Sequence, residues 1–315
     1  MGTAGGSHPV SRSGAPPAVG AWGGTLFLVL AMACFATLDT TTKYISTSVP
    51  LLMALWFRYA FQALVTTIAV LPTRGLAILR TAHPRFQLLR GGLLLTSSLL
   101  AFTSLRYMPV GEFTAIVMIT PLVITLLAST SLGEKVSPLR WMLVSGGFVG
   151  ALVIIRPGHD AFSWAMLLPL GLVACNSWFQ VLTSKMAKFE NPLTMHFYTG
   201  WVGTLVSSLA LPFVWTSLPD WTLWGYLAVL GATATIGHFL LILAYQRSPA
   251  ASLTPYLYAQ IGFAMLGSWM VFSHVPDQWT LAGIALIAVC GAGGAWLAVR
   301  ESRTARQMLI EPVET

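Results

Sequence analysis

The sequence is poor in charge. Only 9% of its 315 residues are Asp, Glu, Lys or Arg, whereas 56% are hydrophobic. Soluble domains carry about 25% charged residues, so the composition predicts a polytopic membrane protein. Acidic residues are fewer than basic ones: the chain has 10 Asp and Glu against 17 Lys and Arg, which gives a formal net charge of +7. The basic residues stand between apolar runs and form no aromatic-interleaved patch, which argues against a nucleic-acid partner.

Cysteine and catalytic motifs are also scarce. Cys34, Cys175 and Cys290 all lie in apolar segments, and none has a Cys or His neighbour at ligand spacing. A disulfide framework and a metal site are therefore not expected. The chain has no GxxxxGK[ST] motif, and its short loops offer neither a His/Asp cluster nor a nucleophile beside a base. We predict no catalytic residues, no cofactor and no bound metal.

Long apolar runs dominate the sequence. They predict an all-α integral membrane protein with ten transmembrane helices, because each run is about as long as a bilayer is thick. The apolar run that begins at Trp22 leads straight into a hairpin and is predicted to be retained as a helix, not cleaved as a signal peptide. The polar stretches 1–21 and 301–315 are predicted to be cytoplasmic tails, the first of them disordered. The predicted spans are 22–43, 52–72, 88–106, 109–131, 139–156, 163–184, 192–215, 224–246, 249–272 and 279–299.

The two halves of the chain resemble each other. Lys43 precedes Pro50 by seven residues, and Lys185 precedes Pro192 by the same interval. In addition, TSLRYMPVGEFTA in the first half aligns with LAYQRSPAASLTP in the second. A duplicated unit with an odd number of spans must insert its second copy upside down. The sequence therefore predicts two inverted five-helix repeats, 22–158 and 159–300, an arrangement typical of secondary transporters.

The basic residues also predict an orientation. With ten spans both termini share one side, and most Lys and Arg fall on that side. It is therefore predicted to be the cytoplasmic one. On this side lie Arg12, Arg74, Arg80, Arg85, Arg90, Lys135, Arg140, Lys185, Lys188, Arg247, Arg300, Arg303 and Arg306, and on the other Lys43, Arg106 and Arg156.

Four strings carry a family resemblance. They are ALWFRYAFQAL, SLRYMPVGEFTAIVMITPLVITLLAS, LGEKVSPLRWMLVSGGFVGALVIIRPG and AYQRSPAASLTPYLYAQIG. Over about residues 22–300 the chain resembles the EamA branch of the drug/metabolite transporter superfamily. Together with WFRY, the string ATLDTTTKYIS resembles the subgroup that contains riboflavin and S-adenosylmethionine carriers. One departure is that Ser273 and His274 stand in the second repeat where the first has Gly133 and Glu134.

The resemblance implies inverted repeats around a central cavity and transport of a small metabolite, such as an amino acid, a nucleoside, S-adenosylmethionine or riboflavin. No enzyme activity is implied. A bacterial inner membrane is the expected location.

Few charged groups lie within the spans, and each needs a partner or a function there. Asp39 and Lys43 are four residues apart, on one face of the first predicted helix. Arg58 lies about 9 Å into the second helix, at a depth similar to that of Asp39. An Asp39–Arg58 bridge with Lys43 nearby is therefore available, either to fasten the first two helices together or to bind substrate or protons. His238, near mid-depth, is either a packed neutral histidine or a group that couples protons to transport.

Uncharged polar residues at mid-depth indicate a cavity, because amides in lipid must find partners. The candidates are Thr96 on the third span, Asn176 and Gln180 on the sixth, and Tyr256 and Gln260 on the ninth. Ordinary hydrogen bonds between helices are the alternative. Pro121, Pro169 and Pro255 are predicted hinges or gates, because proline removes a backbone bond and kinks a helix.

Together these features predict a secondary or facilitative carrier that works by alternating access. The expected ligand is neutral or zwitterionic, with hydrogen-bonding edges and an aromatic ring. Membrane lipids and possible coupling protons are the other expected partners, and the protein is a monomer or a homodimer. An exporter of hydrophobic drugs or lipid-like compounds, a lipid-modifying membrane enzyme and a non-transporting scaffold remain alternatives.

Overall fold

The computed structural model describes residues 21–75, 79–131, 138–155, 164–218, 220–248, 253 and 256–308. Within these ranges the regular structure is entirely helical, as predicted. The principal helices are α1 (Ala21–Ile45), α2 (Leu51–Arg74), α3 (Pro84–Tyr107), α4 (Val110–Val117), α5 (Thr120–Ser131), α6 (Pro138–Ile155), α7 (Leu168–Met186), α8 (Pro192–Ser208), α9 (Leu211–Val214), α10 (Trp221–Arg247), α12 (Ala259–Phe272) and α13 (Gln278–Met308).

Among the described residues, five helical segments are long and apolar enough to cross a membrane. They are Gly24–Ile45, Leu51–Pro72, Pro84–Tyr107, Trp164–Met186 and Trp221–Arg247. Shorter apolar helices cover Val110–Ile124, Trp141–Ile154, Ala259–Phe272 and Gln278–Gly294. The chain is thus an all-α, multi-pass membrane protein. Helix α13 extends to Met308, beyond the end of the predicted last span, so residues 301–308 continue a helix.

Side-chain caps and prolines determine where several helices begin. Asn191 precedes α8, and its side-chain oxygen accepts from the backbone N–H of Leu193 at 2.9 Å. Asp220 caps α10 in the same way, accepting from the N–H of Thr222 at 2.9 Å. The side chain and N–H of Thr222 thereby hold the pKa of Asp220 below its usual value. Capping of this kind satisfies helix N–H groups that have no partner within the helix.

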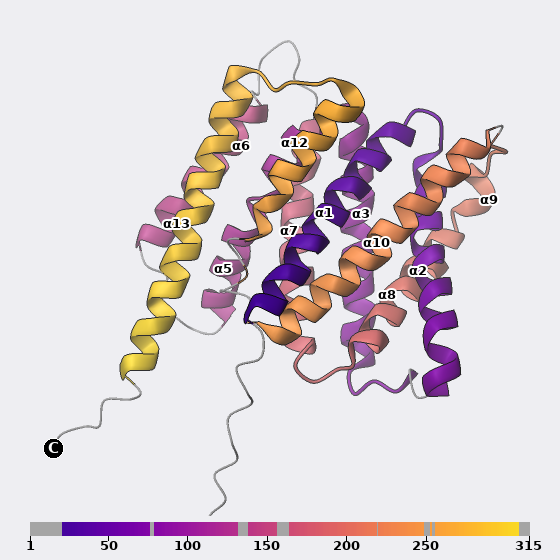
Figure 1. Cartoon of the computed structure of the whole chain (residues 1–315), viewed down its shortest axis with the longest axis horizontal. Coiled ribbons are helices and arrows are strands. Elements are labelled where there is room, and N and C mark those ends of the chain that lie inside the picture. The colour runs from indigo at the N-terminus through magenta and orange to yellow at the C-terminus, as the bar shows by residue number, and fades with distance from the viewer. Residues whose placement is uncertain are drawn as a thin grey trace, which may run out of the picture.

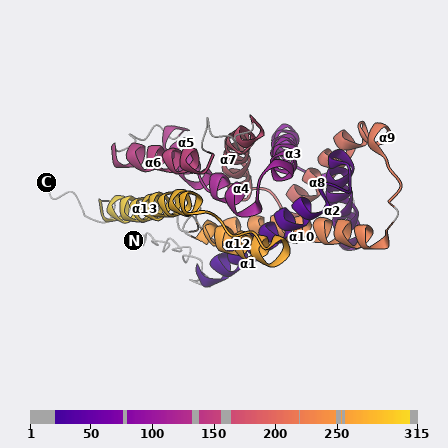
Figure 2. The ribbon, with the colours of Figure 1, turned by 90° about the horizontal axis from the view of Figure 1, so that it is seen from above.

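The helices form two rows with a pair of helices closing each end (Figures 1 and 2). Helices α1, α10 and α12 lie in one row, and α3, α5 and α7 lie in the other. Helix α6 packs on α13 at one end, and α2 packs on α8 at the other. Within the rows α1 contacts both α10 and α12, while α7 contacts both α3 and α5. The space between the rows is therefore enclosed on all sides by helices.

The fourth predicted span is two helices instead of one. Helix α4 ends at Val117 and α5 begins at Thr120. Pro121 therefore lies in the first turn of α5, where its missing N–H costs no hydrogen bond. Pro169 likewise lies in the first turn of α7. Each of the two prolines thus occurs where an α-helix begins and not inside one, and their role as hinges or gates stays a prediction. Pro255 lies outside the described residues.

Candidate functional site

A cavity of about 110 Å³ lies between the two helix rows. Helices α1, α2, α3, α4, α5, α7, α10 and α12 all contribute side chains to it, as does Leu257 before α12. The cavity therefore receives residues from both halves of the chain. Its polar lining residues are Asp39, Arg58, Ser97, Ser98, Thr120, Asn176, Gln180, His238 and Gln260.

Asp39 faces the cavity from α1 and is 8% exposed. Its Oδ2 accepts a hydrogen bond from Nε2 of Gln260, on α12, at 3.2 Å. This bond joins the first half of the chain to the second. Among the described residues, Arg58 has no carboxylate within 4.0 Å. The Asp39–Arg58 bridge considered above is therefore not formed in this conformation, although both side chains line the same cavity.

Arg58 reaches the cavity from α2 and is 2% exposed. One terminal nitrogen, Nη1, donates to Oγ of Ser98 on α3. The other, Nη2, lies 2.8 Å from Nε2 of His238 on α10. A guanidinium can only donate, so Nε2 of His238 accepts and the imidazole is neutral in this arrangement. Nε of Arg58 and Nδ1 of His238 are buried without a hydrogen-bond partner.

The amides of α7 form a third polar group on the wall. Oε1 of Gln180 accepts from the hydroxyl of Tyr245, on α10, at 2.6 Å. Nε2 of Gln180 lies 3.5 Å from Oδ1 of Asn176, at the limit of a hydrogen bond. Asn176 and Gln180 are four residues apart, so they present their amides on one face of α7, as predicted.

The lining has balanced charge and aromatic walls. Asp39 is the one acidic side chain and Arg58 the one guanidinium among the lining residues. The aromatic side chains that line the cavity are Phe35, Phe102, Phe113 and Phe179. Such a surface favours a ligand with little net charge, several hydrogen-bonding edges and a flat ring.

Comparisons with known proteins agree with this geometry. Residues 22–156 match the EamA-like transporter family. The riboflavin transporter of Brucella anthropi is 28% identical over 269 residues, which are 82% of this chain and 94% of the relative. The S-adenosylmethionine uptake transporter of Rickettsia bellii is 27% identical over 262 residues, 83% and 89% of the two chains.

Residues 22–156 thus resemble an EamA-like transporter, and relatives aligned over more than 80% of the chain are small-metabolite transporters. A solved crystal structure with 21% sequence identity superposes with a TM-score of 0.64 and covers 88% of this chain and 98% of its own. At that identity the likeness establishes a shared fold. The family match over residues 22–156 and the relatives together indicate a small-molecule transporter rather than an enzyme.

Two predicted site residues lie away from the cavity. Thr96 is exposed on α3, because the cavity face of that helix follows Leu94, Ser97, Ser98, Ala101 and Phe102. Thr96 follows Leu94 by two residues, which is a rotation of about 200° around the helix axis, so its side chain points away from the cavity face. Tyr256 is 42% exposed. It precedes the turn at Tyr258, after which α12 begins, so the spacing of four to Gln260 does not place the two side chains on one face.

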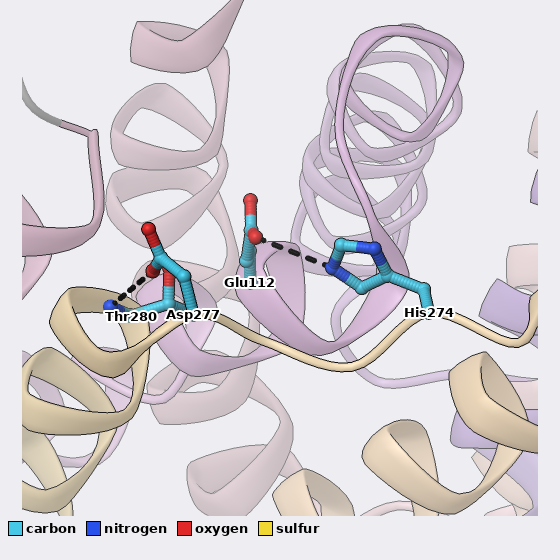
Figure 3. A network of polar contacts seen from close by, with 4 residues as sticks. All are labelled: Glu112, His274, Asp277 and Thr280. Carbon is cyan, nitrogen blue, oxygen red and sulfur yellow. Dashed lines mark hydrogen bonds and ion pairs between the residues drawn. The ribbon is translucent and has the colours of Figure 1, made fainter.

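Lys43 also lies outside the cavity. It lies in the last turn of α1, and its Nζ donates to the backbone carbonyl of Arg106 at 3.4 Å. The same end of the transporter contains the polar network of Figure 3, in which Nε2 of His274 lies 3.5 Å from Oε1 of Glu112. Nearby, Oδ1 of Asp277 accepts from the N–H of Thr280 at 2.8 Å. These residues connect helix ends and loops, so Lys43 belongs to the rim of the molecule.

Arg90 is a buried charge whose position the sequence analysis missed. It was counted with the cytoplasmic side, but it is 1% exposed inside the bundle. Its Nε donates to Oγ1 of Thr183 on α7 at 2.9 Å. Its Nη1 donates to the carbonyl of Met195 at 2.7 Å and to Oγ1 of Thr199 at 2.6 Å, both on α8. The signal available was its place inside the apolar run 88–106, where a charge needs partners.

Proposed function

We propose that this transporter carries a neutral or zwitterionic metabolite with a flat heteroaromatic ring, with riboflavin as the first candidate and S-adenosylmethionine as the second. The observation that carries this proposal is the central cavity, where polar pairs line a pocket with phenylalanine walls. A multiply charged phosphate ester would require several cations, whereas Arg58 is the one cation in the lining. The names of the two relatives described above support the same ligand class.

The proposed architecture is ten membrane spans in two inverted repeats, 22–158 and 159–300. The helix contacts support it, because they remain the same when the two repeats are exchanged. The contact between α1 and α10 then corresponds to that between α7 and α3, and α1 with α12 corresponds to α7 with α5. Contacts between α2 and α8 and between α6 and α13 correspond to themselves. This pattern is expected for two units related by a twofold axis.

The proposed mechanism is alternating access around the cavity. Ligand pockets usually have volumes of roughly 300–1,000 Å³, so a cavity of about 110 Å³ must expand to hold the metabolite. Expansion by separating the halves breaks the Asp39–Gln260 and Arg58–His238 contacts, because each joins residues of different halves. The bound metabolite then supplies replacement partners, which lowers the free energy of the open states. Breaks in the fourth span, between α4 and α5, provide a place for bending.

Proton coupling is part of the proposal. If the imidazole of His238 takes up a proton, its Nε2 no longer accepts from Arg58, and two cations then face each other. Protonation therefore favours release of Arg58 into the cavity. Asp39, on the neighbouring helix α1, provides a second proton acceptor in the same cavity. An imposed pH step across proteoliposomes should drive uptake, and indifference of uptake to the step would refute coupling while leaving facilitated transport intact.

We place the protein in a bacterial inner membrane, with both termini in the cytoplasm, because most Lys and Arg then lie inside. The transport unit is proposed to be a monomer or a homodimer. An accessibility assay with cysteines introduced near either terminus of the chain tests the orientation. Labelling of these cysteines from the outer side of intact cells would contradict it.

The direct test of the proposed function is uptake by proteoliposomes. Radiolabelled riboflavin and S-adenosylmethionine are supplied outside, and the accumulated compound is recovered and analysed. Saturable uptake of one of them, recovered chemically unchanged, is the expected result. Recovery of a modified compound would favour an enzyme, and no saturable uptake of either would refute the proposed ligand class. Protein-free liposomes provide the control for leakage.

A further inference from the structure

A second hollow lies on the outside of the bundle, between α3 and α7. It has a volume of about 480 Å³ and is lined by His83, Phe86, Leu89, Leu93, Trp178, Val181, Leu182, Lys185, Met186 and Phe189. We call these residues the α3/α7 groove. Most of the lining is apolar, and His83 and Lys185 are its basic members. None of these residues lines the central cavity, so the groove is a separate feature.

The two basic residues lie at the same end of the groove. His83 immediately precedes α3, and Lys185 is in the last turn of α7. Glu190, just beyond α7, ties these ends together, because its Oε1 accepts from the N–H groups of Ala82 at 3.0 Å and His83 at 3.2 Å. The groove thus has a basic end near the membrane surface and an apolar remainder.

Positive charge surrounds this end. Arg80, Arg85, Lys185 and Lys188 are exposed there. Glu190 is the only acidic residue in the adjoining segments 79–90 and 181–191, and it is 8% exposed and occupied by backbone donors. The groove entrance therefore presents uncompensated positive charge toward the lipid headgroup layer.

The length of the groove matches one leaflet. From His83 to Leu93 is ten residues, or about 15 Å at the rise of an α-helix, and half of a hydrocarbon core is also about 15 Å. Trp178 and Leu89 lie along this apolar part and are 52% and 53% exposed. An acyl chain inserted beside them would reach the bilayer midplane while its headgroup remains at the basic end.

We propose that the α3/α7 groove binds an anionic phospholipid, with its phosphate at Lys185 and one acyl chain along Leu89 and Trp178. In the orientation proposed above this lipid belongs to the cytoplasmic leaflet, where anionic lipids attract basic clusters. A second copy of the chain is a poorer occupant. A twofold axis along the membrane normal would bring the same basic cluster of each copy to the interface, where like charges repel.

Native mass spectrometry of the detergent-purified full chain tests the proposal, with phosphatidylglycerol and phosphatidylcholine as probes. We expect retention of phosphatidylglycerol in preference to phosphatidylcholine. Lys185→Ala should weaken phosphatidylglycerol binding about fivefold, the effect of one Lys near the membrane surface. The matched control is Lys188→Ala, which removes an equal charge outside the groove and should change binding less than twofold. Equal losses in the two variants, or equal retention of both lipids, would overturn the proposal.

A second pair of variants tests the apolar part of the groove. Leu89→Trp places a larger side chain in the groove, and Leu205→Trp makes a comparable change on exposed α8. The first should abolish specific phosphatidylglycerol binding and the second should leave it intact. Phosphatidylglycerol with brominated acyl chains should also quench wild-type fluorescence more than that of Trp178→Phe. Intact lipid binding in Leu89→Trp would contradict the proposal. A wild-type dimer that the Leu89→Trp substitution converts to a monomer, with lipid binding unchanged, would contradict it as well. Metabolite uptake depends on the central cavity, so failure here leaves the proposed function standing.

Discussion

Arg58 and Arg90 are both buried arginines without a carboxylate within 4.0 Å among the described residues, yet their surroundings differ. Arg90 has three hydrogen-bond acceptors from α7 and α8, and its guanidinium lies 5.2 Å from the centre of the Phe179 ring. Arg58 lines the cavity, and its Nε has no partner. We propose that Arg90, with three acceptors, fastens helices together, whereas Arg58, with its unpaired Nε, is available to a ligand. Burial alone therefore does not distinguish a structural charge from a functional one.

Replacement of Arg90 should have the largest effect on stability. Arg90→Ala removes hydrogen bonds to Thr183, Met195 and Thr199 and leaves a cavity, so we expect a loss of about 3 kcal/mol in the free energy of unfolding. The measurement is thermal unfolding in detergent, where the midpoint should fall by several degrees. Uptake per folded molecule should remain. An unchanged midpoint would show that Arg90 does not fasten α3 to α7 and α8.

Replacement of Arg58 should give the opposite result. Arg58→Gln keeps a hydrogen-bonding side chain but removes the cation, and bonds to charged groups contribute about 1.5–3 kcal/mol. We therefore expect uptake at low substrate concentration to fall about 10- to 100-fold, with little change in the unfolding midpoint. Arg58→Lys provides the comparison that keeps the charge. A large stability loss with normal uptake would assign Arg58 to structure instead.

Asp39→Asn tests the acidic group of the cavity. Asparagine retains an oxygen that accepts from Gln260, so the fold should be unaffected. Removal of the carboxylate should abolish stimulation of uptake by an imposed pH step and reduce uptake about fivefold, a loss of about 1 kcal/mol. Uptake assays with and without the pH step measure both effects. Full stimulation in the variant would exclude Asp39 from proton coupling.

The smallest expected effects distinguish neighbouring residues on α3. Ser98→Ala removes an acceptor from Arg58 and should reduce uptake about two- to tenfold, since an ordinary hydrogen bond contributes about 0.5–1.5 kcal/mol. The matched control is Thr96→Val, because Thr96 is exposed away from the cavity. Its uptake should equal that of wild type within error. Reversed effects would show that α3 presents a different face to the ligand.

The sequence predicted the helical class and most of the polar cavity residues, because a charge or amide within an apolar span has few alternatives to facing inward. Asp39, Arg58, Asn176, Gln180, His238 and Gln260 all line the cavity. The sequence was a less reliable guide where the angular position of a residue around its helix determines whether the side chain faces the cavity. Thr96 and Ser98 differ by two residues and face in different directions, and depth alone does not predict which of them is inside.

Interruptions of helices limited the prediction as well. Tyr256 was assigned to the cavity on the assumption of a continuous helix, and a turn before α12 changed its direction. Arg90 was assigned to a membrane surface because it lies near the start of an apolar run. Its burial depends on Thr183 and Met195, which are about a hundred residues away in sequence. Such long-range partners follow from the packing of α3 against α7 and α8, which local patterns do not specify.

The most direct test of the account compares Arg58→Gln and Arg90→Ala in one experiment, with saturable uptake of riboflavin or S-adenosylmethionine normalised to folded protein. The account predicts that Arg58→Gln loses most uptake while keeping the wild-type unfolding midpoint, and that Arg90→Ala keeps uptake while its midpoint falls. Equal uptake by Arg58→Gln and wild type would contradict the claim that the central cavity binds the transported metabolite.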